Sequence, residues 1–438
     1  MKNRYKNKNV LVYGLSVSGI WVSKLLTKLK AKIFLFDDDA SKLSNVGLKN
    51  SEILNQVDEN IISKMELLIV SPSIEKDNRI IKLALKHNIK ISSEVEFASQ
   101  FCKEIVAVTG TNGKTTTVEL ITAILSTKCK AVACGNNGYP LSKAVLKNKK
   151  AFKVVEISSF MLENAQNFNP HIATILNIEP DHLIRHKTME EYRNLKLSIF
   201  KNLKSSDYAV VNADLQIKPN TNCKQITYSY THNADVRVKD GAIYLFNTKL
   251  INLNELKLKG KHNIYNAMCA ICYAHILNVK PANICKALTA FVPNRFRNEH
   301  IATVNGISFI NDSKSTNIAS TIASVKATKG PVVLFLGGSN KQLNYEELFS
   351  SLSKRVKLIV AFGEISKEIS SANNQQFNLY CFENLNLAFD CATSHAMQGD
   401  TLLFSPSSAS YDQFSNYIER GQKFNELVKA YELENKKK

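Results

Sequence analysis

The stretch VTGTNGKTTT (residues 108–117) has the residue types of a phosphate-binding loop at a shortened spacing. The usual loop sets four residues between its first glycine and a Gly-Lys-Ser/Thr ending, whereas Gly110 and Gly113 bracket only two before Lys114 and Thr115. An apolar run precedes the loop and an amphipathic helical pattern follows it, as such a loop requires. We therefore expect backbone N–H groups and Lys114 to bind nucleotide phosphates and the Thr115 hydroxyl to bind Mg²⁺. A Gly-Asn turn that happens to precede a lysine is the alternative.

Further candidate side chains follow apolar runs, where parallel sheets gather their ligands. Glu156 ends the run KVVE, and a lone carboxylate buried there is costly unless a cation such as Mg²⁺ binds it. A helix cap is the alternative for Glu156. His182 follows Pro180 and Asp181 in a loop, where a lone histidine is more often structural.

Two more segments place polar side chains at the start of a predicted helix. Asp312 and Lys314 lie between an apolar run and a helical pattern, and an N-cap with an incidental lysine is the alternative to a catalytic role. His262 and Asn263 open another helical pattern, where asparagine caps well.

Short apolar runs alternate with helical patterns along the chain and position these side chains. Runs buried on both faces, with helices between them, predict an α/β chain of doubly wound parallel sheets. A length of 438 residues fits three domains of about 150 residues each. We expect a Rossmann-like domain at 1–97, a central phosphate-loop ATPase domain at 98–293 and a Rossmann-like domain at 294–438. The predicted strands are 9–14, 32–37, 67–73, 105–110, 130–135, 153–158, 173–178, 208–214, 306–312, 332–338, 358–363 and 401–408.

The composition limits the classes of partner. The formal net charge is +19, but the lysines are spread along the chain and are dense only at its two ends, without a nucleic-acid-binding motif. No apolar run approaches a membrane span, and the basic N-terminus lacks the pattern of a secretory signal. We therefore expect a cytoplasmic protein with reduced cysteines, Cys269 and Cys272 being core thiols, that binds neither nucleic acid nor membrane. A basic ATP-binding protein that acts on nucleic acid is the alternative from another class.

The shortened loop T-G-T-N-G-K-T resembles that of the Mur ligase family, the ATP-dependent amide-forming enzymes of peptidoglycan precursor assembly. Similar segments follow one another in the family's order between residues 9 and 430. They are GLSVSGIW (14–21), CGNNGYPL (134–141), VVEISSFMLE (154–163), ILNIEPDHLIRH (175–186), LKGKHNIYNAMCA (258–270), PNRFRNEH (293–300), FINDSKSTN (309–317) and SPSSASYDQFSNYIERG (405–421).

The resemblance implies an activity and its substrates. We expect a monomer that uses ATP and Mg²⁺ to join D-glutamate to UDP-N-acetylmuramoyl-L-alanine through an acyl phosphate. The alternatives within this fold are a sibling ligase that adds another amino acid and a folate polyglutamate ligase. The N-terminal unit argues against the folate enzyme, which lacks a nucleotide-sugar domain.

The resemblance also implies roles for single residues. ATP would be bound by Gly110, Thr111, Asn112, Gly113, Lys114, Thr115, Thr116, Asn263, Arg295 and Asp312. The metal would be bound by Thr115, Glu156, His182 and a carbamate on Lys196. Catalysis would involve Lys114, His182, Lys196 and Lys314. The UDP-sugar would contact Val17, Ser18, Asp37, Asn136 and Ser158, and D-glutamate would contact Thr316, Lys341, Ser410 and Tyr417.

Lys196 has a simpler interpretation. It lies beside the helical face made by Tyr192, Leu195 and Ile199, and such a lysine usually packs its stem and leaves its ammonium in water. A carbamate would instead need a partly desolvated amine with a lowered pKa, whose neutral form adds CO₂.

The chain also departs from the family pattern. Ser73, Met161 and Ile184 stand where glycine, glutamine and aspartate are usual. The stretch 337–345 lacks a glycine and an acidic residue, and Tyr411 and Tyr417 replace leucine and phenylalanine. We expect none of these changes to remove a group that faces phosphate or metal.

Overall fold

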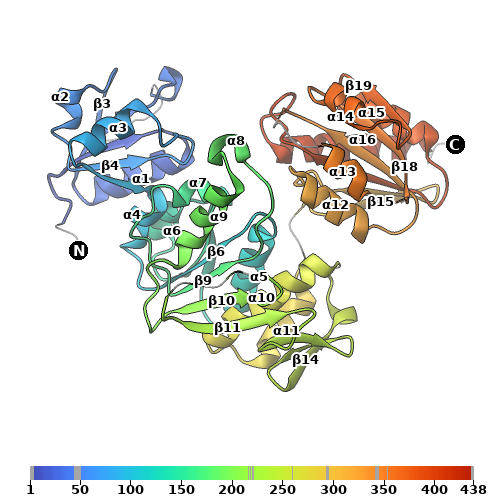
Figure 1. Ribbon diagram of the computed structural model, residues 1–438, viewed down its shortest axis with the longest axis horizontal. Helices are drawn as coiled ribbons and strands as arrows, with labels where there is room; N and C mark the ends of the chain where they lie inside the picture. The colour runs from blue at the N-terminus through green and yellow to red at the C-terminus, as the bar shows by residue number, and fades with distance from the viewer. Residues whose placement is uncertain are drawn as a thin grey trace. The chain divides into compact units, whose positions relative to one another are not determined.

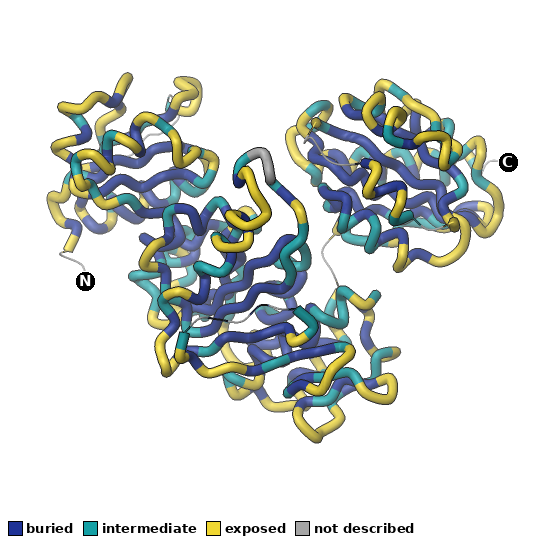
Figure 2. Tube along the Cα trace, in the orientation of Figure 1, coloured by how far each residue is buried: buried dark blue, intermediate teal, exposed yellow. Residues whose placement is uncertain are grey.

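The protein is described here by a computed structural model. It describes residues 4–43, 51–215, 217, 219, 221–258, 260–292, 295–340, 345–352 and 354–435, with Leu183 and Ile184 described by their backbone alone. Three mainly parallel sheets carry helices on their faces, which confirms the predicted α/β class (Figure 1). The central strands of each sheet are the most deeply buried segments, while exposed residues lie mainly on the helices, the connecting loops and the edge strands (Figure 2).

The first sheet has the strand order β3-β2-β1-β4-β5, and all of its pairs are parallel. Val10 and Val12 pack on one face while Leu11 and Tyr13 pack on the other, which explains the unbroken apolar run in β1. The strands are β1 (Asn9–Tyr13), β2 (Lys32–Phe36), β3 (Ser51–Ile53), β4 (Leu67–Val70) and β5 (Lys90–Ser93). The helices are α1 (Val17–Lys28), α2 (Glu59–Ile62), α3 (Arg79–Lys86) and α4 (Glu94–Ser99), with a 3-10 turn at Ala40–Lys42.

The second sheet has nine strands in the order β14-β13-β12-β11-β10-β9-β6-β8-β7. The pairs from β7 to β12 are parallel, and the pairs from β12 to β14 are antiparallel. The strands are β6 (Ile105–Thr109), β7 (Ala131–Gly135), β8 (Phe152–Glu156), β9 (Ile172–Ile175), β10 (Tyr208–Asn212), β11 (Lys224–Ser229), β12 (Val236–Lys239), β13 (Ala242–Leu245) and β14 (Thr248–Asn252). The helices are α5 (Lys114–Ser126), α6 (Leu141–Lys147), α7 (Ser159–Leu162), α8 (Leu183–His186), α9 (Met189–Leu197), α10 (Lys261–Ile276) and α11 (Pro281–Ala290), with 3-10 turns at Ser198–Phe200 and Leu253–Glu255.

The third sheet has the order β15-β16-β20-β17-β18-β19, in which only the β15–β16 pair is antiparallel among the described strands. The strands are β15 (Glu299–Val304), β16 (Ile307–Asn311), β17 (Val332–Gly337), β18 (Val356–Phe362), β19 (Leu379–Phe382) and β20 (Thr401–Ser407). The helices are α12 (Ile318–Ala327), α13 (Tyr345–Ser351), α14 (Ser366–Ala372), α15 (Leu385–His395) and α16 (Tyr417–Asn435).

The predicted strands pair in parallel with one another, as expected, but the antiparallel strands at two sheet edges were not predicted. Two-residue turns explain the antiparallel pairing. Asp240 and Gly241 join β12 to β13 with φ of 47° and 70°, and Asn305 and Gly306 join β15 to β16 with φ of 51° and 76°. Two successive residues with positive φ make the tight turn that matches the twist of a hairpin, and a two-residue connection allows only antiparallel pairing.

The chain forms two compact units. One comprises Met1–Lys257 and Asn263–Phe291, and the other comprises Leu258–His262 and Val292–Lys438. The bounds of the three domains stay a prediction, and Pro293 and Asn294 lie outside the described residues.

The state of the cysteines and the hydropathy of the helices bear on two expectations from the composition. All nine cysteines are free, and Cys269 and Cys272 are buried in α10, which confirms them as core thiols. No helix in the described part of the chain is long and apolar enough to cross a membrane.

Candidate active site

The shortened loop lies between β6 and α5, as its sequence predicted. Gly110 has a φ of 152° and Gly113, the N-cap of α5, has a φ of 82°. A Cβ atom on Gly113 would lie 2.5 Å from the Asn266 side chain of α10, so glycine is needed there for both conformation and space. Thr115 and Thr116 lie in the first turn of α5, and Thr116 is buried. The loop therefore has the strand–turn–helix form that presents backbone N–H groups to phosphates.

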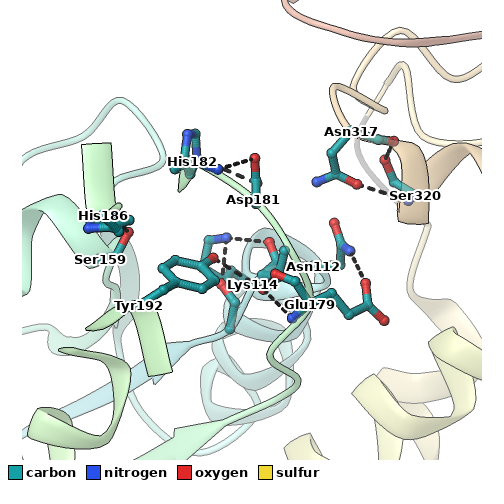
Figure 3. Close-up of polar contacts among 12 residues, drawn as sticks. Asn112, Lys114, Ser159, Glu179, Asp181, His182, His186, Tyr192, Asn317 and Ser320 are labelled. Carbon is teal, nitrogen blue, oxygen red and sulfur yellow. Dashed lines mark hydrogen bonds and ion pairs between the residues drawn. The ribbon is translucent and has the colours of Figure 1, made fainter. Parts of the chain in front are cut away.

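The loop is held by the segment after β9 (Figure 3). The Asn112 backbone N–H donates to Asn177 Oδ1 at 2.8 Å, and Asn177 Nδ2 donates back to the Asn112 carbonyl at 3.1 Å. Asn112 Nδ2 donates to Glu179 Oε2 at 2.8 Å, and the Thr111 hydroxyl accepts from the Glu179 N–H at 3.0 Å. Sequence reasoning did not single out Glu179, although its place after an apolar run was a usable signal.

Two lysines converge on one carbonyl of the loop. Lys114 Nζ donates to the Gly110 and Thr111 carbonyls at 2.9 and 2.7 Å (Figure 3). Lys196 Nζ, from α9, donates to the same Gly110 carbonyl at 2.9 Å. Two lysine side chains, one from the start of α5 and one from α9, therefore meet at the loop, where the phosphate chain of a nucleotide would lie.

The Lys196 ammonium is not in water, so the simpler interpretation of this residue was wrong. Only 1% of Lys196 is exposed, and its Nζ lies 4.6 Å from the centre of the Tyr192 ring. Burial, aided by the charge of Lys114, holds the pKa of the Lys196 amine well below its usual range, and Asp181 opposes this weakly.

Glu156 places a buried carboxylate beside the loop. It pairs with Val108 across the β6–β8 ladder, and only 2% of it is exposed. Its Oε1 accepts from Asn136 Nδ2 at 3.0 Å, whereas its buried Oε2 has no hydrogen-bond partner among the described residues. Ser158 caps α7 by accepting from the Met161 N–H at 3.3 Å, so the alternative of Glu156 as that cap was wrong.

The Glu156 carboxylate fits a hard cation such as Mg²⁺, because such a cation stabilises a buried carboxylate oxygen that has no hydrogen-bond partner. Thr115 supplies a hydroxyl from α5. No group of three or more His, Cys, Asp or Glu side chains in the described part of the chain could hold a metal alone. Oxygen atoms of a bound nucleotide would have to complete such a site.

A short turn carries His182 toward the same region. Helix α8 lies between His182 and Lys187, which have left-handed φ values of 56° and 62°. The His182 N–H donates to Asp181 Oδ1 at 3.0 Å, and its ring lies edge-on to Phe160 with centroids 4.7 Å apart. Left-handed residues other than glycine are uncommon and often lie at functional sites.

His186, one helical turn later, is a buried histidine that sequence reasoning missed. Its ring stacks on Phe160 and Tyr192 at 5.4 and 5.2 Å, and its Nε2 is hydrogen-bonded to Ser159 Oγ at 3.0 Å. Burial and then the nearby charge of Arg185 lower the pKa of His186 to about 4, so it is neutral at pH 7. The i, i+4 spacing from His182 was the available signal.

Helix α10 brings its asparagines to the loop. Asn266 Nδ2 donates to Asn263 Oδ1 at 3.2 Å, and Asn266 lies against Gly113. Because α10 begins at Lys261, Asn263 lies inside the first turn and is not the cap that the sequence suggested. Burial lowers the pKa of His262.

In the first sheet, Asp37 is buried under the loop between β1 and α1. Its carboxylate accepts from the Leu15 N–H at 2.6 Å and from the Asp39 N–H at 2.9 Å. Ser18 and the exposed Val17 begin α1 directly after this loop. The structure therefore gathers Val17, Ser18 and Asp37 at the ends of the neighbouring strands β1 and β2, where Asp37 fixes the backbone.

The other compact unit holds the remaining predicted residues. Asp312 is buried and accepts from the hydroxyls of Ser315, Ser324 and Ser405 and from the Asn298 N–H, and burial raises its pKa. The N-cap of α12 is Asn317, so the alternative of Asp312 as that cap was wrong.

Two predicted cations of this unit contact aromatic rings. Lys314 Nζ lies 3.8 Å from the centre of the Tyr417 ring, and Arg295 lies over Phe296 at 5.1 Å. Arg295 Nε also donates to a Glu299 oxygen at 3.4 Å.

Of the residues predicted to contact D-glutamate, three are described and lie in this unit. Thr316 lies just before α12, Ser410 is buried after β20, and Tyr417 begins α16. Lys341, within the stretch 341–344, lies outside the described residues. Sequence reasoning missed Arg420, which is fully buried and donates to the Ser313 and Ala409 carbonyls.

Comparison with known proteins defines the class. The Mur ligase middle domain matches residues 108–274, and the Mur ligase glutamate ligase domain matches residues 296–408. The chain belongs to the Mur ligase family, the ATP-dependent ligases of peptidoglycan synthesis, which confirms the predicted class of enzyme.

Individual proteins and solved structures of this family are similar to the chain over nearly its whole length. The chain is 35% identical over 446 residues to the UDP-N-acetylmuramoylalanine–D-glutamate ligase of Thermoanaerobacter pseudethanolicus, which covers 97% of this chain and 98% of that protein. Its fold is similar to the UDP-N-acetylmuramate–alanine ligase of Thermotoga maritima, with a TM-score of 0.61, 17% identity and coverage of 97% and 99% of the two chains. The MurF ligase of Thermotoga maritima, solved with ADP, gives a TM-score of 0.60, 15% identity and coverage of 98% and 97%.

Proposed function

We propose that the chain joins D-glutamate to the L-alanyl carboxylate of UDP-N-acetylmuramoyl-L-alanine, with cleavage of ATP to ADP and phosphate. The observation that carries this proposal is the 35% identity, over nearly the whole of both chains, to a protein named for that reaction. The short loop, its two lysines and the buried Glu156 are chemically consistent with it.

The ATP phosphates would lie on the loop at residues 110–116. Lys114 Nζ now donates to two loop carbonyls, and we infer that it exchanges these contacts for phosphate oxygens. Asn263 of α10 is proposed to contact the nucleotide, since its neighbour Asn266 lies against Gly113. A preorganised lysine at a transferred phosphate stabilises the charge that develops in the transition state.

Mg²⁺ is proposed to be held by Thr115 and Glu156, and a second metal ligand is proposed at His182. When bound, the cation offsets the repulsion between a carboxylate and a triphosphate. The unpaired Oε2 of Glu156 is the observation, among the described residues, that supports a cation there.

A carbamate on Lys196 is proposed as a further anionic group near the metal. Burial lowers the pKa of this amine, which favours the neutral form that can add CO₂. The carbamate would turn a buried cation into an anion suited to orienting Mg²⁺.

The remaining roles follow the family pattern. The segment 1–97 is proposed to bind the uridine diphosphate through Val17, Ser18 and Asp37, and the muramoyl sugar is proposed to contact Asn136 and Ser158. Residues 294–438 are proposed to bring Arg295, Asp312 and Lys314 to ATP and Thr316, Lys341, Ser410 and Tyr417 to D-glutamate. A cytoplasmic monomer is proposed.

The proposed chemistry has two steps. The L-alanyl carboxylate attacks the γ-phosphorus of ATP, and the bond to the bridging oxygen breaks to release ADP. The amine of D-glutamate then attacks the acyl phosphate, loses a proton and expels phosphate as the amide forms.

The test is a phosphate-release assay with purified protein, ATP and UDP-N-acetylmuramoyl-L-alanine against a panel of amino acids. We expect D-glutamate to support turnover and L-glutamate, L-lysine, meso-diaminopimelate and glycine not to do so. A different preferred amino acid would instead identify a sibling ligase, and release without the UDP-sugar would contradict the proposal.

A further inference from the structure

Arg185, on α8, connects the turn that carries His182 to a loop of the first sheet. Its Nη1 donates to the Ser73 carbonyl at 3.1 Å and its Nη2 to the Ile74 carbonyl at 2.7 Å. Both carbonyls belong to the loop after β4, more than 100 residues away in sequence. Arg185 is thus one of the side chains that connect the elements of the first sheet to those of the second, as Glu94 and Glu96 of α4 also do.

The guanidinium is fixed by a buried carboxylate. Arg185 Nε and Nη2 donate to the two oxygens of Glu163 at 3.0 and 2.6 Å, a bidentate pair in which the Glu163 side chain is 3% exposed. Two parallel charge-assisted hydrogen bonds fix direction as well as distance, which a lysine ammonium does not do. The Arg185 side chain therefore has one defined orientation.

One series of contacts connects Arg185 to His182 through Phe160. The Arg185 guanidinium lies 4.8 Å from the centre of the Phe160 ring, and the same ring contacts the His182 ring edge-on with centroids 4.7 Å apart. Because α8 is bounded by left-handed residues at both ends, its backbone costs free energy unless neighbouring contacts hold it. Arg185 supplies such contacts from within the four-residue helix.

A second series of contacts connects Arg185 to the loop after β1 through the serines that follow β4. Ser73, whose carbonyl Arg185 holds, has its hydroxyl 3.2 Å from Ser71 Oγ, and Ser71 Oγ lies 3.3 Å from Ser16 Oγ. Ser16 is the N-cap of α1, the 12-residue helix where the uridine diphosphate is proposed to bind. A Cβ on Gly14 would lie 2.4 Å from the Ser71 Cβ, so this contact is close-packed.

We propose that Arg185 is a positioning residue that couples binding of the UDP-sugar in the first sheet to the placement of His182 beside the phosphate loop. This inference rests on the proposed function. Arg185 reaches backbone, Glu163 and Phe160, and it acts through them.

The experiment compares three variants with the wild type. Arg185→Met alone would leave Glu163 buried without its cation and would lower stability, so the double variant R185M/E163Q, which removes both charges, is the main test. R185K keeps a cation without the bidentate geometry. R237M is the matched control, because Arg237 also donates to a backbone carbonyl but lies on β12, away from α8.

Two readouts do not depend on turnover. Calorimetry gives the Kd for UDP-N-acetylmuramoyl-L-alanine, and NMR of histidine-labelled protein gives the His182 ring shifts with and without that ligand. In R185M/E163Q we expect Kd to rise about tenfold and the ligand-induced shift of His182 to be lost. The Kd and the His182 shift of R185K should lie between those of the wild type and those of R185M/E163Q. R237M should match the wild type in both.

Turnover supplies the third readout. We expect R185M/E163Q to raise the KM for the UDP-sugar and to lower kcat by about tenfold each, with less than about threefold change in the KM for ATP. Unchanged Kd and His182 shifts in a folded double variant would overturn the coupling alone. A wild-type chain that does not bind the UDP-sugar would overturn the proposed function together with it.

Discussion

At the scale of single residues, the candidate site combines cations on a short loop with one carboxylate oxygen that has no partner among the described residues. Lys114 and Lys196 share the Gly110 carbonyl, and Glu156 Oε2 lies buried beside the loop. Two amine groups that share one carbonyl, together with a buried carboxylate oxygen without a partner among the described residues, favour the binding of anionic phosphates and of a cation. The residue types predicted the phosphate loop and left Glu156 open between a metal ligand and a helix cap, and only the structure shows that Lys196 reaches the loop.

Lys114 is expected to matter for turnover and not for folding. Lys114→Ala should lower kcat by at least ~10²-fold, since it removes a charge contact from the transferred phosphate, and should leave the melting temperature nearly unchanged. Phosphate release and thermal unfolding check this. Lys128→Ala, beyond the other end of α5, is the control, and near-normal turnover of Lys114→Ala would mean that the loop does not bind ATP.

Substitution of Lys196 tests the proposed carbamate. Lys196→Ala should lose most activity, and formate or acetate in the buffer should restore part of it, because a small carboxylate can occupy the space that the carbamate leaves. The matched control is Lys201→Ala, an exposed lysine just after α9. Full activity of Lys196→Ala without added carboxylate would remove the carbamate from the mechanism.

Substitution of Lys341 tests its proposed contact with D-glutamate. Lys341→Ala should raise the KM for D-glutamate by at least ~10-fold, about the effect of losing one charge-assisted hydrogen bond, while the KM for ATP changes little. Steady-state kinetics with each substrate varied in turn measure this. Equal effects on all three KM values would assign Lys341 to the surface.

At the scale of helices and strands, the sequence predicted the central strands and missed the edges. Strands such as β1, β6 and β17 are buried on both faces, so their residues form continuous apolar runs that are easily recognised. Edge strands such as β3 and β19 are short and partly exposed, and the hairpins at Asp240-Gly241 and Asn305-Gly306 carried a turn signal that was overlooked. Side-chain contacts such as Arg185 to Ser73 depend on tertiary packing and have no sequence signature.

The contact between α4 and α6 gives a pH dependence. Glu94, at the start of α4, is buried, and its pKa is raised by burial from 4.5 to about 7 although it accepts from the Ser142 N–H at 2.5 Å. Between these two pH values the folded state binds more protons than the unfolded state, so stability falls as pH rises through this window. Above about pH 7 the full penalty of a buried carboxylate is present.

Glu94→Gln should therefore raise the free energy of unfolding at pH 8 by roughly 1–3 kcal/mol and should raise it much less at pH 5, near the start of this window. Thermal or urea unfolding at the two pH values measures this. Glu104→Gln, an exposed position just before β6, is the control and should change little at either pH. Equal shifts at pH 5 and pH 8 would show that the ionisation of Glu94 does not affect stability.

At the scale of the whole molecule, a net charge of +19 raises the question of a polyanionic partner. A hollow of about 940 Å³ is lined by Lys128, Lys130, Lys147, Lys149 and Lys150, and no acidic side chain lines it in the described part of the chain. These lysines lie at or just after the C-terminal ends of α5 and α6, where cations stabilise outward carbonyls. Lys128 Nζ, for example, donates to the Leu277 carbonyl at 2.8 Å.

Nucleic-acid binding is therefore expected to be weak. Filter binding with duplex DNA and with RNA should show no retention at about 0.15 M salt, because isolated phosphate contacts weaken steeply with salt. Tight retention under these conditions would favour the alternative of a basic ATP-binding protein that acts on nucleic acid.

The most direct test of the proposed ligase follows one oxygen atom. UDP-N-acetylmuramoyl-L-alanine labelled with ¹⁸O in its L-alanyl carboxylate is incubated with the protein, ATP and D-glutamate, and the released phosphate is analysed by mass spectrometry. Attack of the carboxylate on the γ-phosphorus predicts one ¹⁸O in each phosphate formed from doubly labelled substrate, with the other retained in the new amide. Phosphate that contains oxygen from water and none from the carboxylate would show simple hydrolysis of ATP and would contradict the account.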